Sequence, residues 1–572
     1  MIILPPTEEP VEYNSNYILF WNHVALELNR LDASLAGPQG GPALGARVLG
    51  ILHIAINDAY FALKPDKTGL ATTYLSGNNP DSSYLLPDTR GSTDATNAVA
   101  GAAITVLQEL YTQPNGKVAT NTTSLLDQFL QQRITTFPEL NTLGSSYQFG
   151  TAVGRAILNL LAIKAGEPGV GAGNYHPKTG LYKFNDEPTN PVRIVPVDPN
   201  NPNGPQRAIR PYYGPFYGQT AKRLAVQMKV SGHQSEHIIA DPPVGFGTNQ
   251  IDLYNNTVKD TITEGGAPEL NSTRRSADHT AGAFFWAYDG TNLIGTPPRL
   301  YNQILRKMAW DRRPTHSDPE AINADFARLF ALANAALGDA GVFCWLQKYT
   351  YEFWRPLSGV RNDNGPNADP FWLSFGSPDT NSNRISFKPP FPSYPSGHSV
   401  FGAAFFQTMR LYYKRRDGLT FGDDESDNIG FDFVSDELNG VNRDLRQPYD
   451  PTLPITEQVG TIRTRVVRHF PSLWAAIFDN AISRVWLGVH WQFDAFGEED
   501  VVRTEIGPEG VSVYKNPSDI RYKAMGSRAD RPNNQTFPKG GVPLGIDIAN
   551  DIFQSNLKPT PVNFQPGGML GN

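Results

Sequence analysis

The sequence of 572 residues predicts an all-α protein. Two N-terminal stretches are the main grounds for this prediction. Residues 15–32 place apolar side chains, among them Trp21, Val24 and Leu28, close to one helix face. Residues 44–62 form an almost continuous apolar run of helical length. Elsewhere the pattern predicts no strands beyond small hairpins and no convincing internal repeat.

Further helices are expected in both halves of the chain, several of them preceded by Ser or Asp in a cap-like position. Their predicted ranges are 94–111, 145–163, 299–309, 319–338, 397–413 and 473–487. Residues 165–220 differ, because they are rich in Pro, Gly and Asn. We expect a long surface excursion there, without helix or strand. Residues 359–396 and 414–455 are also predicted to be loops.

This pattern divides the chain into three regions. Residues 1–220 are predicted to form an N-terminal helical bundle that includes the excursion at 165–220. Residues 221–510 are predicted to form a C-terminal helical bundle that carries the functional site. Periodicity fades after about residue 510, so residues 511–572 are expected to be an extended tail packed on the core.

Composition and charge exclude several classes of protein. The net charge of −7, with no basic arm or stripe, argues against a nucleic-acid partner. Cys344 is the single cysteine, which excludes an intrachain disulfide and a cysteine-based metal site. No apolar run reaches the roughly 18 residues of a membrane span, so we expect no transmembrane segment. The N-terminus lacks the charged and apolar regions of a signal peptide.

Three short motifs concentrate the chemistry of the chain. They are Lys348-x6-Arg355-Pro356, Pro395-Ser396-Gly397-His398 and Ser483-Arg484-x5-His490-x3-Asp494. Together they supply three cationic side chains, a hydroxyl, a glycine amide and two imidazoles, and guanidinium groups match the paired oxygens of a phosphate-like anion. Each motif alone is ordinary surface or turn chemistry. In combination they predict a cage for a tetrahedral oxyanion.

The predicted elements suggest how these motifs meet. Lys348 and Arg355 are seven residues apart, which would place them near one face of a single helix. Gly397 stands where a loop enters the helix at 397–413, so amide donors and the helix dipole would face the anion. Arg484 and His490 flank Gly488 near a helix end. The donors would therefore converge from three segments.

These motifs resemble the signature of the vanadium-dependent haloperoxidases and the acid phosphatases related to them. Longer blocks resemble the fungal vanadium chloroperoxidases in particular, namely Trp286-Ala287-Tyr288-Asp289-Gly290, Glu352-Phe353-Trp354-Arg355-Pro356-Leu357-Ser358-Gly359, Phe387-Lys388-Pro389-Pro390-Phe391-Pro392 and Glu437-Leu438-Asn439-Gly440-Val441-Asn442-Arg443-Asp444. The resemblance implies two packed four-helix bundles with long surface loops, a secreted monomer, and vanadate as cofactor. It also implies hydrogen peroxide, halide ions and organic halogen acceptors as reaction partners.

The resemblance also implies roles for single residues. His490 would bond vanadium directly, and the vanadate oxygens would be held by Lys348, Arg355, Ser396, Gly397 and Arg484. His398 would be the acid/base that takes a proton from hydrogen peroxide, and Lys348 would polarise the peroxide. In support, Asp289 would orient Arg484. Asp494 would contact the second ring nitrogen of His490 or a neighbouring backbone group.

Two alternatives remain open at this point. A phosphomonoester hydrolase could use the same cage, with His490 attacking phosphorus and His398 protonating the leaving group. A non-enzymatic helical protein could keep the motif without its chemistry. The 84 residues between His398 and Ser483 exceed the usual phosphatase spacing and favour the haloperoxidase. Trp345 and Phe391 match positions that line the halide site of chloroperoxidases, so we expect oxidation of chloride as well as bromide and iodide.

Overall fold

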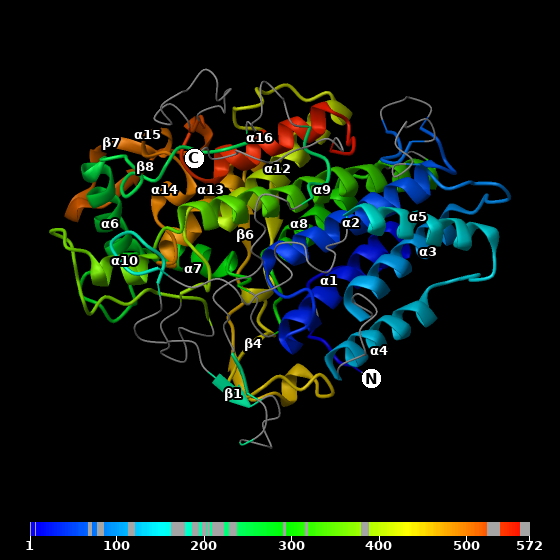
Figure 1. The fold of residues 1–572 in the computed structure, drawn as a ribbon, viewed down its shortest axis with the longest axis horizontal. Coiled ribbons are helices and arrows are strands. Elements are labelled where there is room, and N and C mark those ends of the chain that lie inside the picture. Colours follow the sequence, from blue (N-terminus) through cyan, green and yellow to red (C-terminus); the bar gives the residue numbers. More distant parts are fainter. Residues whose placement is uncertain are drawn as a thin grey trace.

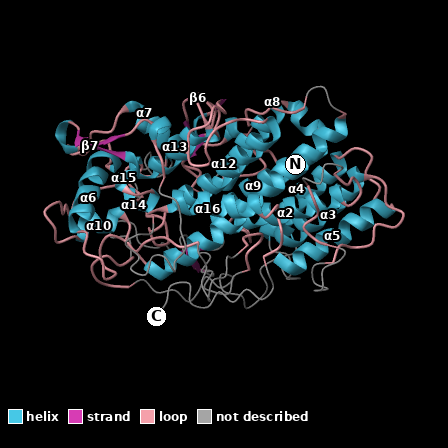
Figure 2. Cartoon of the chain, turned by 90° about the horizontal axis from the view of Figure 1, so that it is seen from above, coloured by secondary structure: helices cyan, strands magenta, loops and turns pink. Residues whose placement is uncertain are grey.

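The protein is built almost entirely of helices, as Figures 1 and 2 show. The structure, a computed structural model, describes residues 2–5, 7–66, 71–76, 85–112, 121–161, 178–185, 194–196, 203, 206–208, 222–227, 237–289, 293–314, 318–378, 388–522 and 538–560. The α-helices within these ranges are α1 (Tyr17–Leu35), α2 (Pro42–Phe61), α3 (Ala95–Leu107), α4 (Asn121–Thr136), α5 (Ser145–Leu161), α6 (Ile251–Gly265), α7 (Ala277–Phe285), α8 (Pro297–Asp311), α9 (Pro319–Tyr351), α10 (Pro356–Asn362), α12 (Gly397–Asp417), α13 (Leu473–Trp486), α14 (Gln492–Ala495), α15 (Glu498–Val501) and α16 (Gly541–Gln554). The all-α prediction is confirmed.

Helix α9 lies at the centre of the molecule, between an N-terminal and a C-terminal set of helices (Figure 1). On one side it packs against α2, which in turn packs against α3 and α5. On the other side it packs against α12 and α16, and α12 also contacts α13. The grouping into two four-helix bundles stays a prediction. The two halves share α9. Lys348 lies on α9, and Gly397 is the first residue of α12, which packs against α9.

Among the described residues, the strands are short and occur in four antiparallel pairs. They are β1 (Ile194–Pro196) with β2 (Gln206–Ala208), β3 (Phe431–Phe433) with β6 (Arg468–Phe470), β4 (Arg443–Leu445) with β5 (Gly460–Ile462), and β7 (Val502–Ile506) with β8 (Ser512–Tyr514). The pair β1–β2 corrects the expectation that residues 165–220 hold no strand. Each strand is only three residues long, which is too short for a strand pattern to stand out in a Pro- and Asn-rich sequence. The rest of that excursion lies largely outside the described residues.

Two further predictions need correction. Residues 511–572 are not extended throughout, because α16 forms there and packs against α12. Gly545 allows this contact, since a Cβ atom on it would overlap the Val400 carbonyl oxygen. Gly and Pro residues at the start of α16 obscured the apolar spacing of Ile548 and Ile552, which are buried. Helix α9 also continues beyond the predicted end, to Tyr351.

Among the described helices, α9 alone has the length and apolar composition of a membrane span. Its most apolar window is completely buried inside the fold.

Candidate oxyanion site

Lys348 and Arg355 meet at the site, although they do not share a helix. Helix α9 ends at Tyr351, and Glu352 adopts a left-handed backbone conformation with φ of 49°. Arg355 then precedes α10 as its N-cap residue. The prediction of one helix face is therefore wrong, because the chain turns sharply between the two side chains. Both are nevertheless completely buried, and both contact the loop at residues 391–395.

The Lys348 ammonium group holds the loop that leads into α12. Its Nζ atom donates to the carbonyl oxygens of Pro392 at 3.0 Å, of Ser393 at 2.9 Å, and of Pro395. An ammonium group has three protons, so all of them have acceptors in this structure. Burial lowers the pKa of Lys348, while the carbonyl oxygens favour its charged form. Lys348 thus brings a charge to the site and also fixes its backbone.

Ser396 and Gly397 begin α12, as the sequence predicts. Ser396 is the N-cap, and its side chain accepts from the Ser399 amide. A Cβ atom on Gly397 would come within 3.2 Å of the Trp345 ring, so the absence of a side chain allows the indole to close against the helix start. The free amides and the dipole at the start of a helix favour an anion, so the start of α12 suits an oxyanion.

His490 and Arg355 are in direct contact. Arg355 Nη1 lies 2.8 Å from His490 Nε2 and donates to the Val489 carbonyl oxygen at 2.8 Å. Burial, followed by the charges of Arg355, Lys348 and Arg484, holds the pKa of His490 well below its usual range. The imidazole is therefore neutral, which is the form that binds metals. The three cationic groups around the ring act in the same direction as burial.

The other face of His490 is held by a carboxylate. His490 Nδ1 lies 2.7 Å from Asp494 Oδ2, one turn further along the chain. The same oxygen accepts from the Trp491 amide at 3.1 Å and from the Ser393 hydroxyl. Because this oxygen is an acceptor for every neighbour, Nδ1 carries the proton, and the lone pair of Nε2 faces Arg355 Nη1 inside the site. The expected contacts of Asp494 with the ring and with a neighbouring backbone group both occur.

His398 is oriented by backbone rather than by a carboxylate. Its Nε2 atom lies 2.9 Å from the Trp286 carbonyl oxygen and 3.0 Å from that of Ala287. Carbonyl oxygens only accept, so Nε2 carries the proton and Nδ1 is the basic nitrogen. Burial first, and then the Arg484 charge, lower the pKa of His398 well below its usual range. His398 is thus a neutral base.

Arg484 pairs with Asp289, as the sequence predicts. Arg484 Nη2 donates to Asp289 Oδ1 at 2.7 Å, and both side chains are almost completely buried. Arg484 Nε and Nη1 and Arg355 Nη2 are buried N–H groups without a hydrogen-bond partner among the described residues. Unsatisfied buried donors are costly, and an oxyanion would satisfy several of them at once.

Trp345 and Phe391 form an aromatic wall beside these cationic groups. Their ring centroids are 5.1 Å apart. Lys348 Nζ lies 5.6 Å from the Trp345 ring and 5.4 Å from the Phe391 ring, and the Arg355 guanidinium carbon lies 5.0 Å from Phe391. Such a wall excludes water and lowers the local dielectric constant, which strengthens the field of the nearby charges.

The structure therefore brings the three sequence motifs together at one buried cationic site. It adds two features that the sequence did not predict, namely Ser393 and the backbone carbonyls of Trp286 and Ala287. Ser393 lies three residues before Ser396, a predicted site residue. A polar side chain in this proline-rich loop could have indicated it as a further site residue. Backbone acceptors leave no such signal. The chemistry of this donor set fits a phosphate-like anion that accepts an additional nitrogen ligand.

Comparisons with known proteins agree with this geometry. Family models match two parts of the chain, the "Vanadium chloroperoxidase N-terminal domain" at residues 4–223 and the "VCPO second helical-bundle domain" at residues 328–504. Vanadium chloroperoxidase of Curvularia inaequalis is 50% identical over 587 aligned positions, covering 99% of this chain and 94% of that protein.

Solved structures share the fold at lower sequence identity. Apo-type bacterial vanadium-dependent chloroperoxidase is 14% identical, with a TM-score of 0.51, over 91% of this chain and 95% of that one. The holo-type bacterial enzyme is 16% identical, with a TM-score of 0.50, over 91% of this chain and 93% of that one. These likenesses show the fold, whereas the family models and the close relative show the family. The chain belongs to the vanadium haloperoxidase family and is close to the fungal vanadium chloroperoxidases.

Proposed function

We propose that this protein is a vanadate-dependent haloperoxidase that oxidises chloride, and also bromide and iodide, with hydrogen peroxide. One halide, one hydrogen peroxide and one proton give one hypohalous acid and one water, and the hypohalous acid then halogenates organic acceptors. The main support is the buried cationic site, in which Arg355 and Arg484 have N–H groups without partners in the described part of the chain, near the neutral imidazole of His490. An anion with an open coordination position would accept from these N–H groups and would take the imidazole nitrogen as a ligand.

The residues that would hold vanadate follow from this arrangement. His490 Nε2 would be the metal ligand, because Asp494 fixes the proton on Nδ1. Arg355, Arg484, the Ser396 hydroxyl and the Gly397 amide would bind the oxygens, with Lys348 adding its charge. Bound vanadate would supply a Lewis acid that activates hydrogen peroxide without changing oxidation state.

His398 would handle the proton of hydrogen peroxide. Its Nδ1 is the basic nitrogen, because Nε2 donates to backbone carbonyls. Its pKa lies well below the usual range, so it is ready to accept a proton at mildly acidic pH. Arg484, which lowers that pKa, would stabilise the negative charge left on the oxygen.

The aromatic wall supports chloride as a substrate. Chloride gives up electrons less readily than bromide, so its oxidation needs a more electrophilic oxygen. Trp345 and Phe391 exclude water beside Lys348, and the lower dielectric constant strengthens the Lys348 field at that position. The protein's position close to the fungal chloroperoxidases agrees with this.

The proposal is tested with chelator-treated protein, orthovanadate, hydrogen peroxide and a cyclic diketone as halogen acceptor. We expect halogenation with chloride and with bromide only after orthovanadate is added, and competition by phosphate. Hydrolysis of an aryl phosphate by the same preparation serves as the control for the phosphatase alternative. Vanadate-independent phosphatase activity without halogenation would overturn the proposal, and activity with bromide alone would reassign the enzyme as a bromoperoxidase.

A further inference from the structure

The segment that orients His398 is itself held from one side by a buried acidic residue. This segment, residues 286–289, follows α7 and provides the two carbonyl oxygens that accept from His398 Nε2 as well as the Asp289 carboxylate that pairs with Arg484. A short stretch of irregular backbone therefore sets the position of two groups of the site. What fixes this stretch decides how precisely those groups are placed.

Tyr288 is the point at which this segment is anchored. Its backbone has φ of 36°, a left-handed conformation that residues with side chains rarely adopt, and the residue is completely buried. Such a conformation persists only where surrounding contacts enforce it. The Tyr288 hydroxyl donates to Gln303 Oε1 at 2.8 Å and accepts from the Asp436 amide at 2.8 Å.

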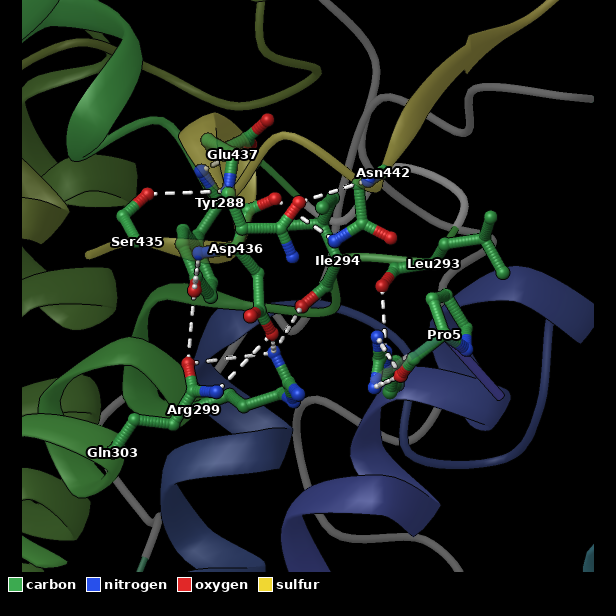
Figure 3. A network of polar contacts seen from close by, with 12 residues as sticks. Pro5, Tyr288, Leu293, Ile294, Arg299, Gln303, Ser435, Asp436, Glu437 and Asn442 are labelled. Carbon is green, nitrogen blue, oxygen red and sulfur yellow. Dashed lines mark hydrogen bonds and ion pairs between the residues drawn. The ribbon is translucent and has the colours of Figure 1, made fainter. Parts of the chain in front are cut away.

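Glu437 supplies the contact to the backbone itself. Its Oε1 atom accepts from the Tyr288 amide at 2.9 Å, and the Glu437 side chain is completely buried. Figure 3 shows the polar contacts among Tyr288, Gln303, Asp436 and Glu437, together with Arg299, which binds Asp436. The other carboxylate oxygen of Glu437 pairs with Arg463, which also pairs with Asp444.

Glu437 belongs to the long insertion between the second and third sequence motifs. Two of its acidic residues are paired with buried arginines, since Arg299 binds Asp436 at 2.6 Å and Arg463 binds Glu437. Buried charges paired in this way are rigid, because any displacement would leave a charge unpaired. The insertion thus presents Glu437 to the Tyr288 amide from a fixed position.

We propose that Glu437 is a positioning residue for the reaction, acting through the Tyr288 amide to hold the carbonyls that orient His398 and the carboxylate that orients Arg484. The inference rests on the proposed haloperoxidase function. The insertion would then stabilise the position of the segment that contacts His398 and Arg484. Glu437 itself touches neither the anion nor the peroxide.

The test compares Glu437→Ala with two matched variants. Glu437→Gln keeps a side-chain oxygen that can accept from the Tyr288 amide but removes the charge that faces Arg463. Asp444→Asn disturbs the same Arg463 pair without touching Tyr288. For each variant, orthovanadate affinity is measured by calorimetry on vanadate-free protein, together with thermal unfolding and the pH dependence of kcat/KM for peroxide.

We expect Glu437→Ala to lower kcat about tenfold or more and to weaken orthovanadate binding about tenfold, as misplacement of orienting groups typically does. Carbonyl acceptors favour the charged imidazole, so their loss lowers the pKa of His398 and moves the acid limb of the pH profile to lower pH. Glu437→Gln and Asp444→Asn are expected to lose stability while keeping the wild-type pH profile.

A Glu437→Ala protein that is less stable but has an unchanged pH profile and unchanged orthovanadate affinity would overturn the inference. An equal shift in Asp444→Asn would overturn it as well. If Glu437→Ala yields no folded protein, Glu437→Asp takes its place, since the shorter side chain keeps the charge that faces Arg463 but withdraws the oxygen from the Tyr288 amide. Inactive wild-type protein would instead refute the proposed function, so the two failures are distinguishable.

Discussion

The two histidines of the site are held in place by different parts of the molecule. His490 is oriented by Asp494, four residues later, and by Ser393, both of which lie within or next to the sequence motifs. His398 is oriented by two backbone carbonyls more than a hundred residues earlier in the chain. The segment that carries these carbonyls is contacted at Tyr288 by Glu437 and Gln303, which belong to other parts of the chain.

We interpret this difference as a division between cofactor binding and reaction. A carboxylate one turn away fixes one ring nitrogen of His490 and frees the other as a ligand, which is what cofactor binding needs. Burial and the Arg484 charge keep the pKa of His398 low, and the carbonyl acceptors of Nε2 leave Nδ1 as its basic nitrogen. The His490 region would retain the anion, and the His398 region would act on peroxide.

The largest effect is expected from replacing the proposed ligand. His490→Ala should reduce halogenating activity more than about a hundredfold, beyond the range typical of residues that only support a ligand. Weaker orthovanadate binding should remain, because Lys348, Arg355 and Arg484 still attract an anion. His469→Ala removes an exposed histidine that also pairs with an aspartate and serves as the control. Full activity of the His490 variant would show that this side of the site does not bind the cofactor.

Asp494→Ala tests the His490 side of the site by removing the carboxylate that orients the His490 ring. The His490 ring would lose the acceptor that fixes its proton on Nδ1, so orthovanadate affinity should fall about 10-fold to 100-fold. Calorimetric titration of the vanadate-free protein measures this change. Asp432→Ala, which removes the carboxylate partner of exposed His469, is the matched control. Unchanged affinity with reduced kcat would place Asp494 on the reactive side and contradict the comparison.

The pH dependence tests the other side. A base must be neutral to accept a proton, so activity is present above the pKa of His398 and is lost as pH falls through it. Because burial and Arg484 lower that pKa, the acid limb of kcat/KM for peroxide should lie well below pH 6.5, the usual value for histidine. A limb at or above that value would show that His398 is not the neutral base. Rates in matched buffers at constant ionic strength check this.

The smallest effect concerns the halide. Phe391→His would replace part of the aromatic wall near Lys348 with a polar ring that admits water. We expect chloride turnover to fall several-fold more than bromide turnover, because the higher dielectric constant weakens the field that chloride oxidation needs. Steady-state rates with each halide measure the ratio. An unchanged ratio would remove Phe391 from halide selection.

The site could be predicted more completely from the sequence on the His490 side. Motif spacing indicated the Asp494 contact, and it placed Gly397 at a helix start. It failed for Lys348 and Arg355, because the left-handed Glu352 between them ends α9 in a way that periodicity does not reveal. Two sequence blocks of the family resemblance, around Tyr288 and Glu437, had no evident physical relation until the structure placed them in contact.

The most direct test is an orthovanadate titration of vanadate-free wild-type protein and of His398→Ala, followed in parallel by calorimetry and by halogenating activity. We expect both proteins to bind orthovanadate with similar affinity. Activity should rise with saturation in the wild type and stay about 10²-fold to 10⁴-fold lower in the variant, the usual contribution of a general acid/base. If His398→Ala loses affinity as strongly as activity, or is activated like the wild type, then binding and reaction are not divided between the two histidines.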